Sequence, residues 1–515
     1  MGGDCFGLDN QRNQAGCSIL KHVKIFIFVV LLIRVLLAAF GPYELAGDEA
    51  HYWEWSQRPA LSYYTKGPGV AWSILLSTEV FGNTVFGIKF PAILCFALLQ
   101  WWTCQASIRL SPQTESACWF GAAVPILLPG IFASGQFMTT DITSIAFAMG
   151  AAVAAHDAIV QLGTPSSRML PWLRLGLWAG IAVLFKYLAI VVPAACVLFT
   201  LIRWSKWRWT AQDRLGAGLS AVVGTICTLP ILIWNAQRDW PTLSHQLGHL
   251  GAEGGDAKIS SGWQPVWTVE YVLGQLLLVL GPPAAIALWK ARRLGSESIF
   301  LASGAILPLM FFVTSFSSDV EANWPLTGWA LLAPMLGVAL AKWRAAGTNY
   351  GLRQHVMRWG LTSALIVSFA PYLAHHERAA MWFKRVTGHQ ERAQTVAEWQ
   401  EKTQATHVIA AKYQDASLLA FYLPNRPTLV YCASHHMGRR RSPYDYFPDT
   451  DLTCKSLVGQ DLLLYRGSLE AWNRTIKCDE VKILQDEPRI FLAKNWLGLK
   501  GKYQQSEDRG IQKSR

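Results

Sequence analysis

The sequence has little charge for its length. Of its 515 residues, 16% are charged and 52% are hydrophobic, whereas about a quarter of the residues in ordinary soluble domains are charged. This composition excludes a chain made only of soluble domains. Apolar runs of about twenty residues, long enough to cross the ~30 Å hydrocarbon layer of a bilayer, recur through the first three-quarters of the chain. The sequence therefore predicts an α-helical polytopic membrane protein.

Acidic residues are scarcer than basic ones. There are 34 Asp and Glu against 46 Lys and Arg, which gives a formal net charge of +12. Such an excess can indicate nucleic-acid binding, but here the basic residues gather beside the ends of apolar runs, as the positive-inside rule describes. We therefore expect no nucleic-acid partner. The loops on one face of the membrane have few basic residues, and we expect this face to be the outer one. It contains loop 41–69, Asp141, residues 235–268 and the chain after Leu373.

The ten cysteines do not form a disulfide framework. Half of them fall in apolar runs, where a free cysteine behaves as a small core residue. Cys432, Cys454 and Cys478 share the polar C-terminal region. One disulfide is possible there, for example between Cys454 and Cys478, if that region is exported. No cleavage signature follows the first apolar run, so we expect that run to be a retained span.

Composition divides the chain into four parts: a cytoplasmic tail (1–21), a transmembrane domain (22–374), a small extracytoplasmic α/β domain (375–503) and a disordered tail (504–515). We predict about eleven transmembrane helices. The first is His22–Phe40, later ones include Ala117–Phe137 and Val269–Trp289, and two short apolar segments flank Lys186. In the C-terminal domain, periodicity predicts helices at Glu391–Gln404 and Asp415–Leu423 and strands at His407–Tyr413, Pro427–Cys432, Leu462–Tyr465 and Arg489–Ala493.

Polar chemistry is concentrated in the first loop, which begins with Gly47-Asp48-Glu49-Ala50-His51-Tyr52. Asp and Glu at the start of a helix complement its dipole, so Asp48 and Glu49 could simply cap a helix. The alternative is a general base or a metal ligand beside the bilayer. We favour that functional interpretation because carboxylates bind sugar hydroxyls and the neighbouring aromatic rings stack on sugar faces. His51 and Trp55 should share one helix face.

Two lysines stand in unusual places. Lys66 follows Tyr63 and Tyr64 and precedes Gly67-Pro68-Gly69, a rigid turn that would present its ammonium to an anionic group. Lys186 interrupts an apolar run, and an ionisable residue within a membrane is a functional candidate by default. If the helix breaks at Lys186, the lysine could reach a phosphate at the outer interface. Snorkelling to the interface is the structural alternative for Lys66.

Further polar residues are expected on the same side. Asp141 precedes an apolar helix and could be its N-cap or a second acid. Glu321 and Asn323 form a polar cluster before Trp324-Pro325. His245 and His249, with Glu253 four residues further on, have a spacing that could bind a divalent metal. The run from Gly438 to Arg441 could be a solvated basic loop or a flap that reaches an anionic lipid.

Taken together, these residues resemble a known family. Gly47-Asp48-Glu49 with His51-Tyr52, followed by Tyr64-Thr65-Lys66-Gly67-Pro68, is similar to the first outer loop of the GT-C glycosyltransferases. It looks most like the bacterial branch related to protein O-mannosyltransferases and to the lipid A aminoarabinose transferase. The similarity extends to the segments around Asp141, Lys186 and Glu321–Pro325, and into the C-terminal domain.

The resemblance implies a GT-C fold, a polyprenyl-phosphate sugar donor and a role for each matching residue. The implied catalytic residues are Asp48, Glu49 and Asp141; the donor phosphate contacts are Lys66, Lys186 and His51; the substrate-binding residues are Tyr52, Tyr63, Tyr64, Glu321 and Asn323. Two positions depart from the aminoarabinose branch. His51 stands in place of an arginine, and Thr65 in place of a glutamate implicated in metal binding. No metal ligand is therefore assigned, and participation of a divalent metal stays open.

The resulting hypothesis is an inverting transfer of a sugar to a lipid A-like or other cell-envelope acceptor at the outer face of the inner membrane. Lys66 and Lys186 stabilise the leaving phosphate, and Asp48 accepts the acceptor's proton if the acceptor is a hydroxyl. If the acceptor is a lipid phosphate, no base is needed and Asp48 would orient the sugar instead. Protein O-glycosylation is the alternative within this class. A transporter of lipid-linked sugars is the alternative outside it, but such a protein would need inverted repeats, and none is visible. We expect a monomer embedded in membrane lipid.

Overall fold

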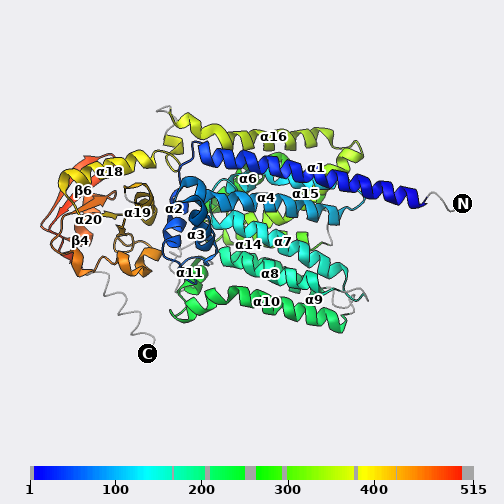
Figure 1. Ribbon diagram of the computed structural model, residues 1–515, viewed down its shortest axis with the longest axis horizontal. Coiled ribbons are helices and arrows are strands. Elements are labelled where there is room, and N and C mark those ends of the chain that lie inside the picture. The colour runs from blue at the N-terminus through cyan, green and yellow to red at the C-terminus, as the bar shows by residue number, and fades with distance from the viewer. Residues whose placement is uncertain are drawn as a thin grey trace.

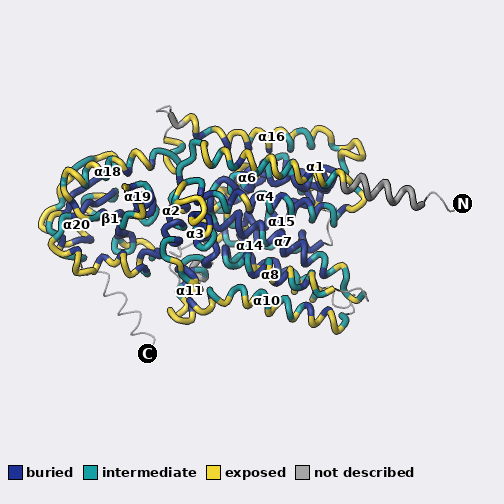
Figure 2. Tube along the Cα trace, viewed as in Figure 1, coloured by how far each residue is buried: buried dark blue, intermediate teal, exposed yellow. Residues whose placement is uncertain are grey.

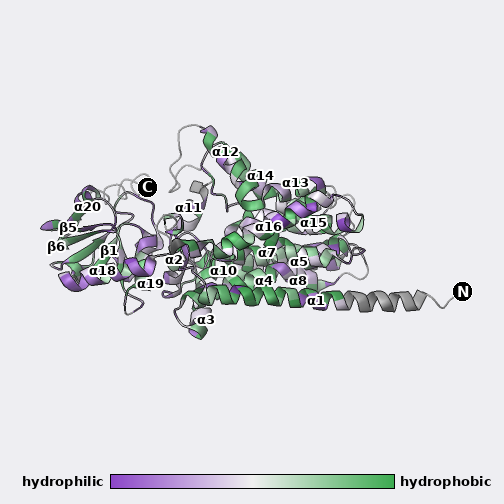
Figure 3. Ribbon diagram, turned by 90° about the horizontal axis from the view of Figure 1, so that it is seen from above, coloured by the Kyte–Doolittle hydropathy of each residue, from purple (hydrophilic) through white to green (hydrophobic). Residues whose placement is uncertain are grey.

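The computed structural model describes residues 5–164, 168–202, 209–249, 263–292, 298–375, 381–424 and 426–500. An apolar helical bundle forms one end of the elongated molecule and a mixed α/β domain forms the other (Figure 1). Hydrophobic residues dominate α1 and the other bundle helices, and hydrophilic residues gather on the C-terminal domain (Figure 3). The molecule therefore divides into a bilayer-compatible part and a water-compatible part.

The bundle and its first loop contain most of the helices. They are α1 (Cys5–Phe40), α2 (Gly47–Ser56), α3 (Gly69–Phe81), α4 (Val85–Leu110), α5 (Ala117–Leu127), α6 (Pro129–Ser134), α7 (Thr140–Val160), α8 (Met169–Phe185), η1 (Tyr187–Ile190), α9 (Val191–Ile202), α10 (Ala211–Ala236), α11 (Pro241–His249), α12 (Pro265–Leu273), η3 (Gly274–Leu280), α13 (Pro282–Ala291), α14 (Ile299–Thr314), α15 (Leu326–Ala345), α16 (Tyr350–Phe369) and η4 (Ala370–His375).

The bundle has a buried centre and an apolar outside. In α7 and α15 about four-fifths of the apolar window is buried, namely 78% and 83%. In the outer helices α1, α10 and α16 only 11%, 17% and 28% of that window is buried (Figure 2). Those exposed faces carry large apolar side chains such as Phe28, Val222 and Ile366. A helix that is apolar on its exposed face is suited to hydrocarbon rather than water, so the bundle is a membrane domain.

The apolar runs of the sequence do not correspond one to one with the helices of the structure. Among the described residues, six helices are long and apolar enough to cross a membrane, a bent pair would make a seventh, and five further apolar helices are shorter. The bent pair is α12–η3 with α13, which turns by 92° at Gly281, where φ is 77° and Pro282 follows. The predicted span Val269–Trp289 is therefore bent rather than one straight helix. The predicted span Ala117–Phe137 is likewise divided into α5 and α6 at Leu128, before Pro129. The total of about eleven stays a prediction.

The C-terminal domain is built on a five-stranded sheet of order β2-β1-β3-β6-β5. Its strands and those of a second, two-stranded sheet are β1 (His407–Ala410), β2 (Val430–Cys432), β3 (Leu462–Tyr465), β4 (Ile476–Lys477), β5 (Glu480–Asp486), β6 (Arg489–Lys494) and β7 (Gly498–Leu499). Its helices are α18 (His389–Thr403), α19 (Tyr413–Tyr422), η5 (Pro443–Tyr446), η6 (Pro448–Thr450), η7 (Lys455–Leu457) and α20 (Leu469–Thr475). The strands β2, β1 and β3 are parallel, and β6 and β5 are antiparallel. The predicted helices and strands of this domain are present, but β1 ends at Ala410, before the predicted end at Tyr413, because Tyr413 already begins α19, and β2 begins only at Val430. The three C-terminal cysteines are free thiols.

The two domains meet where α2 packs on α19 (Figure 1). The ring of Trp53 meets Phe421 edge to face at 5.0 Å, and the backbone N–H of Leu45 donates to the Tyr422 hydroxyl at 2.9 Å. Gly47 is required at this seam, because a Cβ there would lie 2.7 Å from Cβ of Gln414. The first loop is therefore held from both sides, by the bundle and by the C-terminal domain.

Candidate active site

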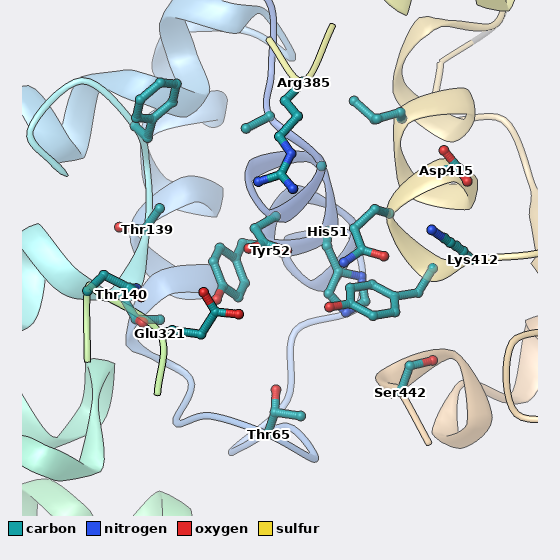
Figure 4. A pocket seen from close by; sticks show the side chains of 18 of the residues that line it. His51, Tyr52, Thr65, Thr139, Thr140, Glu321, Arg385, Lys412, Asp415 and Ser442 are labelled. Atoms are coloured by element: carbon teal, nitrogen blue, oxygen red, sulfur yellow. The ribbon is translucent and has the colours of Figure 1, made fainter. Parts of the chain in front are cut away.

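A cavity of about 2330 Å³ opens between the membrane domain and the C-terminal domain. The start of α2, the loop around Lys66, the start of α7, the break at Lys186 and the loop before α15 line it on the bundle side. Figure 4 shows Tyr52, Glu321 and Arg385 converging on it from three segments, with Lys412 and Asp415 on the wall formed by the C-terminal domain. The sequence-predicted residues Asp48, His51, Tyr52, Lys66, Asp141, Lys186, Glu321 and Asn323 all line this cavity.

Asp48 lies in the first turn of α2 with its carboxylate open to the cavity. Its side chain makes no hydrogen bond or ion pair with the described residues. The surrounding protein raises the pKa of Asp48 by desolvation, and the charges of Arg440 and Lys66 partly offset that rise. A carboxylate with a raised pKa and no internal partner is suited to accept a proton.

Glu49 has a different environment from its neighbour. Its carboxylate is fully buried and accepts hydrogen bonds from Lys89 Nζ at 2.6 Å, the Met138 backbone at 2.7 Å and the Ala46 backbone at 2.9 Å. Glu49 thus ties α2 to α4 and to the segment before Asp141, and it does not line the cavity. The structure gives Glu49 a bridging position, and the catalytic role expected of it stays a prediction. Lys89 was not selected from the sequence, although a lone lysine in an apolar run was a usable signal.

Lys66 presents an open cation. The loop rests on the end of α8, since a Cβ on Gly67 would lie only 2.2 Å from the Leu184 carbonyl oxygen. The Lys66 ammonium lines the cavity and has no ion-pair partner among the described residues. Burial, with smaller contributions from Lys186 and Arg440, lowers the pKa of Lys66 to about 8. A desolvated, unpaired ammonium is suited to a phosphate ligand.

Lys186 and Asp141 form an ion pair. The helix α8 ends at Phe185, and Lys186 is extended, which confirms the predicted break. Its Nζ donates to Asp141 Oδ1 at 2.5 Å, and Asn323 Nδ2 donates to Asp141 Oδ2 at 3.0 Å. Thr139, not Asp141, is the N-cap of α7. The positive charge expected at Lys186 is therefore balanced within the protein before any ligand binds.

The aromatic residues divide into two groups. Tyr52 lines the cavity, and burial together with the charges of Asp48 and Asp141 raises the pKa of its hydroxyl well above the usual value. Tyr63 donates its hydroxyl to the Trp55 carbonyl at 2.8 Å and is buried, and Tyr64 stacks on Tyr446. Neither of these two predicted substrate-binding tyrosines lines the cavity.

His51 lines the cavity but is engaged by the protein. Its Nδ1 is 3.1 Å from Ser417 Oγ, and its Nε2 accepts from Trp55 Nε1 at 3.2 Å, so the two rings share a helix face as predicted. Burial, with a contribution from Arg440, lowers the pKa of His51 to about 3. The imidazole is therefore neutral and does not provide the phosphate-binding cation expected from the sequence.

Arg440 comes from the C-terminal domain and adds a second positive charge, besides Lys66, near Asp48. It donates Nη2 to the Tyr413 hydroxyl at 3.2 Å and lines the cavity. In the sequence this arginine is only one of a basic run. No local pattern reveals that the loop after β2 reaches the first loop of the chain.

The metal hypothesis rested on His245, His249 and Glu253. His245 is buried and its ring lies 5.0 Å from that of Tyr64. The side chain of His249 and all of Glu253 lie outside the described residues. Within the described part of the chain, no group of three or more His, Cys, Asp or Glu residues could hold one ion.

Comparison with known proteins shows what this chain is similar to. The family model described as dolichyl-phosphate-mannose-protein mannosyltransferase matches residues 65–234. The lipid A galacturonosyltransferase RgtD of Rhizobium johnstonii is 26% identical over 483 residues, covering 92% of this chain and 93% of that protein. The undecaprenyl phosphate-α-4-amino-4-deoxy-L-arabinose arabinosyl transferase 1 of Sodalis glossinidius is 28% identical over 259 residues, 49% of this chain and 45% of the relative.

Solved structures agree with the sequence relatives. The crystal structure of ArnT from Cupriavidus metallidurans bound to undecaprenyl phosphate has a TM-score of 0.62 at 16% identity, and 91% of this chain and 97% of that chain are covered. The apo structure of the same protein has a TM-score of 0.61 at 17% identity, with the same coverage. At this identity the match defines the fold.

The fold and the relatives define a class. The chain is a membrane glycosyltransferase with the GT-C fold. Within that class it is similar to lipid A galacturonosyltransferase and to the aminoarabinose transferases.

Proposed function

We propose that this protein transfers a sugar from a polyprenyl-phosphate donor to a lipid A-like acceptor, with inversion at the anomeric carbon. The observation that supports it best is the pair of unpartnered charges, Asp48 and Lys66, facing one cavity in a chain with the fold of ArnT. The relative named for lipid A transfer supports the acceptor class, and the relative named for an undecaprenyl-phosphate sugar supports the donor class. The location proposed is the inner membrane, with the cavity and the C-terminal domain on the periplasmic side.

The proposed reaction is one in-line displacement. An acceptor hydroxyl oxygen forms a bond to the anomeric carbon while the bond from that carbon to the phosphate oxygen breaks. The hydroxyl proton passes to Asp48, and the bonding electron pair leaves with the polyprenyl phosphate. Lys66 stabilises the charge that develops on that phosphate, the kind of preorganised electrostatic effect that usually contributes most to catalysis.

The remaining cavity residues position these two groups. The Asp141–Lys186 pair and Asn323 join the start of α7 to the break after α8 and to the loop before α15. We propose that the neutral Tyr52 hydroxyl and Glu321 bind sugar hydroxyls, because both point into the cavity (Figure 4). No step of this mechanism requires a metal ion.

The test is Asp48→Asn in purified protein reconstituted in lipid, with undecaprenyl-phosphate sugar as donor and lipid A as acceptor. We expect kcat to fall by roughly 10²–10⁴-fold, the usual contribution of a general base. Thermal unfolding should not change, because the Asp48 side chain makes no hydrogen bond or ion pair with the described residues. Asp451→Asn is the matched control, since Asp451 is exposed and lies outside the cavity. Full activity of the Asp48→Asn protein would remove Asp48 from the mechanism.

A further inference from the structure

The cavity has a strong excess of positive charge. Eleven Lys and Arg residues line it, against six Asp and Glu residues. A polyprenyl-phosphate sugar brings one negative charge on its phosphodiester. Lys66 already faces that phosphate in the proposed mechanism, so most of the excess is not accounted for by the donor. Unpaired charge of one sign in a cavity draws ligands of the opposite sign.

Four of these cations form what we call the C-terminal basic cluster: Arg392, Lys412, Arg439 and Arg466. Lys412 follows β1, Arg439 follows β2 and Arg466 follows β3. These three strands are parallel neighbours, so the three side chains start from the same edge of the sheet. The crevice at the carboxyl ends of parallel strands is where open α/β sheets bind ligands.

The backbone holds Arg466 in an uncommon conformation to place it there. Arg466 has φ of 62° and Gly467 has φ of 79°, and a non-glycine residue in this region is typical of functional sites, where the fold imposes the strain. The turn is fixed by Trp472 Nε1 donating to the Arg466 carbonyl at 2.7 Å and by the Arg466 N–H donating to the Arg489 carbonyl at 2.8 Å. The Arg466 guanidinium lies 3.1 Å from Asp415 Oδ1.

The cluster leaves specific groups open. Lys412 and Arg439 have exposed side chains with no hydrogen bond or ion pair to the described residues. Asp415 is only 6% exposed, yet its Oδ2 has no hydrogen-bond partner there. The site thus offers two exposed cations for an anion, and beside them a buried carboxylate oxygen that lacks a hydrogen-bond donor among the described residues. A sugar ring that carries a phosphate or a carboxylate has both groups close together.

This cluster is separate from the charges around Asp48. The charges that act on Asp48 come from Arg440, Lys66, Asp141 and Glu49. Those that act on Asp415 come from the four members of the C-terminal basic cluster. The two sets share no residue, although both line one cavity. A ligand at the cluster therefore lies beside the reacting donor rather than on it.

We propose that the C-terminal basic cluster binds an anionic sugar of the acceptor glycolipid, with its phosphate or carboxylate on Lys412, Arg439 and Arg466 and a ring hydroxyl on Asp415. This inference rests on the proposed function. It assigns acceptor selection to the C-terminal domain and donor activation to the bundle.

The experiment compares three acceptors in the reconstituted transfer assay: lipid A with its phosphates, the same lipid after enzymatic dephosphorylation, and a dephosphorylated lipid that carries a uronic acid. The test protein is Lys412→Gln/Arg439→Gln. The control is Lys482→Gln/Arg474→Gln, which removes the same charges from exposed positions outside the cavity. The binding of each acceptor without donor is measured in parallel by native mass spectrometry.

We expect the test variant to raise KM for the anionic acceptors by roughly tenfold or more, as loss of charge-assisted contacts does, with donor KM and the rate on the neutral lipid within about twofold of the parent. The anionic acceptor that loses more affinity identifies the anion as phosphate or carboxylate. An equal loss on the neutral lipid, a raised donor KM or no change at all would each overturn the proposal. If the parent protein transfers no sugar, the proposed function fails, and the binding measurement still tests the cluster.

Discussion

Lys66 should set the upper pH limit of the reaction. In the proposed mechanism its ammonium stabilises the leaving phosphate only while it is protonated, and burial lowers its pKa from 10.5 to about 8. The active form is therefore present below pH 8 and lost as the pH rises through that value. About nine-tenths of Lys66 is charged at pH 7 and about one-tenth at pH 9, whereas an ordinary lysine is almost fully charged at both. We expect kcat/KM for the donor to fall roughly tenfold between these two pH values.

The substitution Lys66→Arg isolates this effect. Arginine stays charged throughout the accessible pH range, so the alkaline limb of kcat/KM should disappear even if the absolute rate falls. In the parent, kcat should begin to fall at a higher pH than kcat/KM does, because a bound phosphate favours the charged ammonium. Lys482→Arg, at an exposed position away from the cavity, should leave the profile unchanged. An alkaline limb that persists in Lys66→Arg would refute the reasoning.

Two buried ion pairs give further tests. Lys89→Met leaves the Glu49 carboxylate buried without its cation and should lower the free energy of unfolding by about 3–5 kcal/mol, measured by thermal unfolding in detergent. Adding Glu49→Gln should restore much of this loss. Unchanged stability of the single variant would contradict the pairing. Lys186→Met should lower kcat by about a hundredfold, and Asp141→Asn in the same background should add little because the two act as a unit. Additive losses in the double variant would instead assign them independent roles.

The sequence was most informative where local patterns suffice. The helix break at Lys186, the shared face of His51 and Trp55 and the strands around β1 and β3 follow from spacing and apolar alternation, and the structure contains all three. Apolar length alone did not show the bend at Gly281, because α12 to α13 reads as a single run in hydropathy.

The roles of paired charges could not be read from the chain. Asp48 and Glu49 are adjacent in the sequence, but Glu49 is buried in an ion pair with Lys89 and Asp48 faces the cavity. Only the tertiary structure distinguishes these two environments. From the sequence, Lys186 was interpreted as a free cation, because its partner Asp141 is distant along the chain. Arg440 was missed as a neighbour of Asp48 for the same reason: its position depends on how α19 docks against α2.

The docking of α2 on α19 has a consequence for biogenesis. The first loop is synthesised early, but Leu45, Trp53 and His51 find their partners Tyr422, Phe421 and Ser417 only after most of the chain has been made. Until then the loop lacks one of its two walls. We therefore expect an unfinished or truncated chain to lack the complete site and to consume no lipid-linked sugar.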